Sequence, residues 1–142
     1  MTASGFIALA GDDPGIRAFD LTNDTLELST PLTALERVHA VTVDVRGTEL
    51  YASATASVEE DEPSGHVVRF RIGEAAGAVR LDRLSDAPSG GTTPCHLAAV
   101  GDLVYVANFR AFGSPGGAGA TSQGSLGVLR LVCEQRDATA RG

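Results

Sequence analysis

The chain has 142 residues, a length typical of one domain, and 43% of them are hydrophobic. Its formal net charge is −7, and all eleven basic residues are arginine. An acidic chain without a basic stripe argues against nucleic acid and against an anionic membrane surface as partners, and the absence of lysine excludes Schiff-base chemistry and a Walker-type phosphate loop.

The termini and the cysteines set further bounds. No run approaches the roughly 18 apolar residues of a membrane-spanning helix, and the N-terminal stretch MTASGFIALAG lacks the basic region of a secretory signal. Cys95 and Cys133 make neither a disulfide framework nor a metal-spaced pair. We therefore expect a soluble cytoplasmic protein with no metal and no cofactor.

The first predicted unit spans residues 5–30 and lacks an inner strand. Phe6–Ala10 and Gly15–Leu21 are expected to pair as a hairpin, because the turn-forming sequence GDDP separates them. Leu26–Leu28 follows an Asn-Asp turn and fits a short outer strand. Thr30–Arg37 is then predicted to form a helical turn, since its second residue is a proline, which suits the first helical position.

The second unit, residues 38–84, is complete. Its four predicted strands are Val38–Asp44, Glu49–Thr55, His66–Ile72 and Val79–Leu84. The acidic run Glu59–Glu62 could suggest a divalent-ion site. Such sites need ligands folded around a point, and four successive carboxylates before a proline fit a solvated loop better.

The third unit, residues 94–131, lacks an outer strand. Its predicted strands are Cys95–Val100, Leu103–Phe109 and Leu126–Leu131. The Gly-rich segment 113–124 is expected to be a flexible loop, because it has neither the Lys-Ser/Thr end of a phosphate loop nor the setting of a nucleophile elbow around Ser122. Residues 132–142 are polar and unpatterned, and we expect a frayed tail.

The units resemble one another in sequence. Val38–Val43 matches Cys95–Val100 with histidine on histidine, and Leu50–Ala54 matches Val104–Asn108 with tyrosine on tyrosine. The third strands, IRAFDL, VVRFRI and LGVLRL, alternate apolar and charged positions in a way that predicts one buried face. The second strands recur at 50 − 6 = 44 and 104 − 50 = 54 residues, close to the period of propeller blades. The prediction is an all-β, partial β-propeller of antiparallel blades (incomplete, full, incomplete) in a single domain over residues 1–142.

The segment PSGGTTPCHL followed by LVYVANF, with GIRAFDL and GSLGVLRL, resembles the start of the lactonase family of seven-bladed β-propellers. The resemblance covers roughly Gly5 to Leu131, which is two to three blades of seven. It implies hydrolysis of a lactone, with the phosphorylated sugar lactone 6-phosphogluconolactone of the pentose phosphate route as the best-known substrate. The family's histidine- and arginine-bearing catalytic segments belong to later blades, and nothing here matches them. We therefore expect no activity from the chain alone; the alternative is a non-catalytic module that serves as a binding or assembly scaffold.

Two residues are candidates for substrate binding. His96 opens an inner strand and could bind a phosphate or lactone oxygen, or it could be a structural histidine, since His39 recurs at the matching place. Asn108 ends a strand and could reach a ligand or simply make a turn. Cys95 is not expected to pair with His96, because neighbouring residues of a strand point to opposite faces. Unshielded blade faces and edges predict self-association or an unstable fragment.

Overall fold

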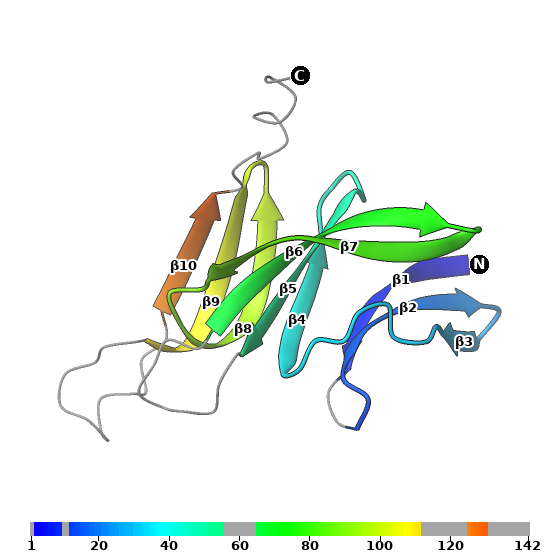
Figure 1. Ribbon diagram of the computed structural model, residues 1–142, viewed down its shortest axis with the longest axis horizontal. Coiled ribbons are helices and arrows are strands. Elements are labelled where there is room, and N and C mark those ends of the chain that lie inside the picture. The colour runs from blue at the N-terminus through cyan, green and yellow to red at the C-terminus, as the bar shows by residue number, and fades with distance from the viewer. Residues whose placement is uncertain (1, 10–11, 56–64, 112–124, 131–142) are drawn as a thin grey trace.

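The computed structural model describes residues 2–9, 12–55, 65–111 and 125–130, and the regular structure of these residues is entirely β (Figure 1). The strands form three antiparallel sheets, each a meander, that stand side by side in chain order. The bounds of the strands are β1 (Thr2–Leu9), β2 (Gly15–Thr22), β3 (Thr25–Leu28), β4 (Val38–Val43), β5 (Glu49–Thr55), β6 (Gly65–Ala75), β7 (Ala78–Pro88), β8 (Gly91–Val100), β9 (Leu103–Ala111) and β10 (Ser125–Arg130).

The strand order confirms the predicted partial propeller. The middle sheet has the order β4-β5-β6-β7, whereas within the described residues the first sheet contains β1-β2-β3 and the last contains β8-β9-β10. The pairing register shows that β1 takes the place of β5 and that β8 takes the place of β4. Among the described residues, the first sheet thus has no counterpart of β4 and the last sheet has none of β7, as the sequence indicated.

The helical turn expected over Thr30–Arg37 is not formed. Because β3 pairs only with Phe19–Thr22 of β2, the backbone groups of Ile16 have no partner in that strand. The irregular segment supplies partners instead: the Thr33 carbonyl accepts from Ile16 N at 3.2 Å, and Leu32 N donates to the Ile16 carbonyl at 2.8 Å. Burial of Leu35 then fixes the segment against the core, so a tertiary contact overrides the local helical signal.

Two apolar clusters hold the three sheets together. The first, between the first and middle sheets, is built from Ile16, Leu35, Val38, Leu50, Ala52, Ala54, Val68, Phe70 and Leu81. The second, between the middle and last sheets, is built from Tyr51, Val67, Leu97, Val104 and Val106. Successive residues of β5 and β6 therefore pack on opposite neighbours. The prediction of a single buried face is wrong for β6, because a strand of the middle sheet has a sheet on either side.

Several predicted features lie outside the described residues. These are the acidic run 59–62, the Gly-rich segment 113–124 with Ser122, and the tail 132–142 with Cys133. In the part of the chain that the structure describes, no helix has the length and apolar character that a membrane crossing requires.

Candidate functional site

All three histidines of the chain lie toward the same end of the sheets. In the middle sheet His66 pairs with Ala54 and Pro88, so the start of β6 adjoins the end of β7. His39 is the second residue of β4, whose first residue also pairs with Ala54. In the last sheet the pair Pro94 and Asn108 corresponds to Val38 and Ala54, and His96 lies two residues further along β8. These strand ends are at the bottom of Figure 1, and they form the candidate site.

The innermost strands β4 and β8 share an irregularity at this end. Each has a register shift at the same place, between Val38 and Ala40 and between Pro94 and His96. The residues that precede these shifts, Arg37 and Thr93, both have left-handed backbones, with φ of 50° and 49°. Such values are uncommon for non-glycine residues and unusual for a β-branched threonine. Because β-bulges re-aim side chains and are over-represented next to active sites, the repeated bulge marks this end of the inner strands.

The pairing register corrects the predicted alignment of the histidines. Pairing with the tyrosine-bearing strands aligns Val38 with Pro94, so His39 corresponds to Cys95, and His96 corresponds to Ala40. The match of histidine on histidine is therefore wrong by one residue. His96 also does not open its strand, because β8 begins at Gly91. His39 and His96 therefore do not occupy matching positions, and this argument for a structural role of His96 no longer holds.

The side chain of His96 is exposed. It shares a face of the last sheet with Ala107, its partner across the strands, and that face is turned away from the middle sheet. The structure gives it no hydrogen bond within the described residues. The neighbouring Cys95 occupies the bulge, where its thiol donates to the Ala107 carbonyl at 3.4 Å.

Asn108 has a different environment, because it is only 3% exposed. Its Nδ2 donates to the Ser89 carbonyl at 2.9 Å, and Ser89 Oγ donates back to Asn108 Oδ1 at 2.6 Å. Ser89 N in turn donates to the Gly65 carbonyl at 2.9 Å. Asn108 thus fixes the short link between β7 and β8, and its amide already has protein partners.

His39 and His66 each have a polar neighbour at this end. His39 Nε2 lies 2.7 Å from Thr55 Oγ1, and burial lowers the pKa of His39. This imidazole is therefore neutral at pH 7 and can accept a proton. His66 Nδ1 lies 2.8 Å from Asp86 Oδ1. Sequence reasoning did not single out either pair, because their members are 16 and 20 residues apart and meet only through strand pairing.

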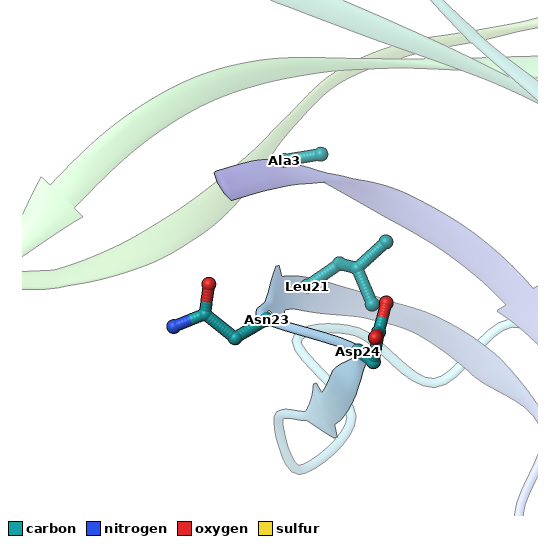
Figure 2. Close-up of a pocket in the computed structure, with 4 residues that line it drawn as sticks. All are labelled: Ala3, Leu21, Asn23 and Asp24. Atoms are coloured by element: carbon teal, nitrogen blue, oxygen red, sulfur yellow. The ribbon is translucent and has the colours of Figure 1, made fainter. Parts of the chain in front are cut away.

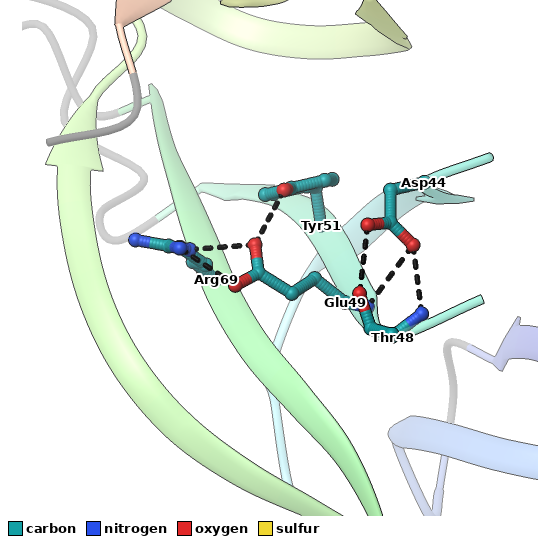
Figure 3. Close-up of polar contacts among 5 residues, drawn as sticks. All are labelled: Asp44, Thr48, Glu49, Tyr51 and Arg69. Carbon is teal, nitrogen blue, oxygen red and sulfur yellow. Dashed lines mark hydrogen bonds and ion pairs between the residues drawn. The ribbon is translucent and has the colours of Figure 1, made fainter. Parts of the chain in front are cut away.

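A second polar group, at the opposite end of the middle sheet, is structural (Figure 3). Arg69 donates to both carboxylate oxygens of Glu49, at 2.8 and 2.6 Å, and Tyr51 Oη donates to Glu49 Oε2 at 2.6 Å. Burial alone would raise the pKa of Glu49, but the hydrogen bonds from Arg69 and Tyr51 outweigh it and hold that pKa below its usual value. Burial, with the hydrogen bond to Glu49, raises the pKa of Tyr51 well above its usual value.

The Asp44 carboxylate organises the adjacent β4–β5 turn. Its Oδ1 accepts from Thr48 N and Glu49 N, at 2.8 and 3.2 Å (Figure 3). Burial would raise the pKa of Asp44, but these backbone hydrogen bonds lower it overall. The turn therefore places Glu49 where its carboxylate accepts hydrogen bonds from Arg69. The network stabilises this end of the sheet, and its side chains already have hydrogen-bond partners within it.

A shallow hollow of about 310 Å³ lies on the first sheet (Figure 2). It is lined by Ala3, Leu21, Asn23 and Asp24. Asn23 and Asp24 form the β2–β3 turn, and their positive φ values of 47° and 67° are those of a type I′ hairpin. The hollow contains none of the predicted site residues. Within the described residues, no group of three or more histidine, cysteine or acidic side chains could hold a metal ion.

The sequence was compared with models of known protein families. A model described as lactonase, 7-bladed beta-propeller matches residues 4–134. No curated protein matches the sequence at a significant level.

Proposed function

Since this chain belongs to the lactonase family of seven-bladed β-propellers, we propose that it forms part of an enzyme that hydrolyses a phosphorylated sugar lactone. The observation that carries the proposal is the family match over residues 4–134, which spans all three sheets. 6-Phosphogluconolactone is the substrate to test first. A cytoplasmic location and the absence of a nucleic acid partner belong to the same proposal and rest on the composition of the chain.

The chemistry requires a base and hydrogen-bond donors near one carbonyl. Water attacks the lactone carbonyl, the ring C–O bond breaks, and the ring oxygen leaves as the hydroxyl of the sugar acid. We place the lactone at the bulged ends of β4 and β8. There the exposed His96 is available to bind a phosphate or carbonyl oxygen, and the neutral His39 is available to accept a proton. Asn108 positions the link between β7 and β8 through its hydrogen bonds with Ser89.

We propose that the chain alone does not accelerate the spontaneous hydrolysis of the lactone. The hollow on the first sheet is lined by Ala3, Leu21, Asn23 and Asp24, which include no histidine and no arginine. Formation of 6-phosphogluconate with and without the chain tests this. We expect equal rates. A rate above the spontaneous one that disappears in His39→Gln would show that the chain is itself catalytic.

Binding is tested with the stable product, 6-phosphogluconate, as the probe. We expect its titration to shift the ring resonances of His96 and His39 and to leave those of His66, which is held by Asp86, nearly unchanged. The His96→Ala variant is expected to weaken binding without changing the fold, because the side chain is exposed. Unmoved histidine resonances at millimolar product would contradict the placement of the site.

A non-catalytic scaffold is the second candidate. It is favoured by a specific observation, the exposure of large apolar side chains on the outward faces of the first and last sheets. A chain that associates with a partner but binds neither lactone nor product would support this function over the first.

A further inference from the structure

The exposed apolar side chains of the chain are concentrated on two faces. Leu21, Leu26 and Leu28 lie on one face of the first sheet, because Leu26 pairs with Leu21 and Leu28 with Phe19. On the last sheet, the outward face carries Val100, Phe109, Leu126 and Val128. Each set lies on the side opposite the core cluster of its own sheet. Apolar patches of this kind mark interaction surfaces.

The two open faces correspond to the two sides of an interface that the chain already contains. Between the middle and last sheets, Tyr51 and Val67 of one sheet pack against Val106 and Leu129 of the next. By pairing register, Tyr105 and Leu126 on the open face of the last sheet take the places of Tyr51 and Val67.

The first sheet supplies the complementary side. Ile7 and Phe19 take the places of Val106 and Leu129, and both lie on its open face. The Phe19 ring covers Gly5, where a Cβ would approach Phe19 Cε1 to 2.9 Å, so the aromatic ring lies flat across the strand. The open face of the last sheet and that of the first therefore correspond to the two halves of one repeated contact.

We propose that the open face of the last sheet docks on the open face of the first sheet of a second copy of this chain, head to tail. The contact continues the series of sheet-on-sheet interfaces that joins the first sheet to the middle one and the middle one to the last. The charged side chains nearest these faces have partners within their own copy: Arg17 pairs with Asp13, and Arg130 lies 4.0 Å from Asp102. Burial of the faces thus leaves these arginines with partners.

Head-to-tail contact uses two different surfaces, so it produces a ring if the rotation between copies closes and an open series of copies if it does not. The wild-type chain is expected to form oligomers whose mean mass increases with concentration. Two variants separate the surfaces: Leu26→Arg places a charge on the first face, and Val128→Arg places one on the last. Val45→Arg is the matched control, because Val45 is 96% exposed and lies in the β4–β5 turn, outside both faces.

Sedimentation velocity measures the outcome, with circular dichroism and thermal unfolding to confirm that each variant is folded. We expect each of the two face variants to be monomeric alone, and their equimolar mixture to form a 1:1 dimer, because each retains the surface that the other lacks. The control is expected to associate like the wild type. A wild-type monomer at all concentrations would overturn the proposal.

Association of either face variant by itself would also overturn it, by showing contact between like faces or pairing of strand edges. The measurement involves no lactone, so its failure leaves the proposed lactone chemistry untouched. Conversely, a chain that associates as expected but binds no product would retain this inference and lose the proposed function.

Discussion

Glu49 shows how one side chain can stabilise the contact between two strands and a turn at once. Its backbone N–H donates to Asp44 in the turn, and its carboxylate accepts from Arg69 and Tyr51. The side chains of Glu49 and Arg69 are each only 16% exposed. A partly buried, bidentate pair of this kind is costly to break, because removal of one partner leaves the other without its counter-charge.

Glu49→Gln is expected to lower the free energy of unfolding at pH 7 by about 1–3 kcal/mol, since it removes charged hydrogen bonds from a buried site. The pKa of Glu49 is lowered in the folded state from 4.5, so its stabilisation is complete above that pH and is lost as the pH falls through the folded-state value. Urea titrations between pH 3 and 7 should therefore show a flatter acid limb in the variant. Glu27→Gln, at an exposed position of β3, is the control; an equal effect there would contradict the role of Glu49.

Asn108→Ala tests whether this buried amide is structural. The change removes the donor to the Ser89 carbonyl and the closer acceptor of the Ser89 hydroxyl, which keeps only the Gly91 carbonyl at 3.4 Å; such a loss costs about 1–3 kcal/mol for buried groups. Asn108→Asp should be at least as destabilising at neutral pH, because a carboxylate oxygen then faces the Ser89 carbonyl. Chemical denaturation measures both. Unfolding midpoints equal to the wild type would show that the contact with Ser89 carries no stability.

At the scale of strands, the sequence predicted the pattern of pairing better than the positions of individual residues. The alignment of Val67–Ile72 with Leu126–Leu131 is confirmed by the register over residues 126–130, because these strands are regular and repeat their apolar positions. The alignment of His39 with His96 is wrong by one residue because it rested on residue identity, whereas pairing with β5 and β9 sets the register of these strands. The bulge lies at the same place in both strands, so it does not change their relative alignment.

The site was less predictable than the fold for the same reason. His66 meets Asp86, and His39 meets Thr55, only because strands distant in sequence are brought into register. Burial of Asn108 depends on the link between two sheets, which no local pattern indicates. Family resemblance indicated the class of reaction, whereas the contacts of these side chains depend on the three-dimensional arrangement of the strands.

Gly127→Ala is expected to strain the contact between the last sheet and the β7–β8 link. A Cβ at this position would collide with the Ser89 carbonyl and approach Val106 Cγ1 to 2.8 Å. Such overpacking costs about 1–3 kcal/mol. Gly73→Ala, in β6 of the middle sheet, is the control, because its nearest atoms are the ends of Arg80 and Asp82 side chains at 3.8 Å. Thermal unfolding compares the two; a variant at 127 as stable as that at 73 would show that the link adapts freely.

For the molecule as a whole, the middle sheet is the most protected part of the described chain. Its strand β5 is paired on both edges and buried on both faces, whereas all four residues of β3 are exposed. Native-state hydrogen exchange should therefore be slowest in β5 and the facing part of β6, and fastest in β3 and β10. Equal protection across the three sheets would contradict a core built from two separate sheet-on-sheet contacts.

The two tyrosines occupy matching rows of neighbouring sheets, yet one is sealed against a carboxylate and the other lies on an outward face. The chain has no tryptophan, so these two phenols dominate its ultraviolet emission. A Tyr51→Phe protein would emit mainly from Tyr105, and a change in that emission on raising the concentration would report, without any added dye, how crowded the outward face has become.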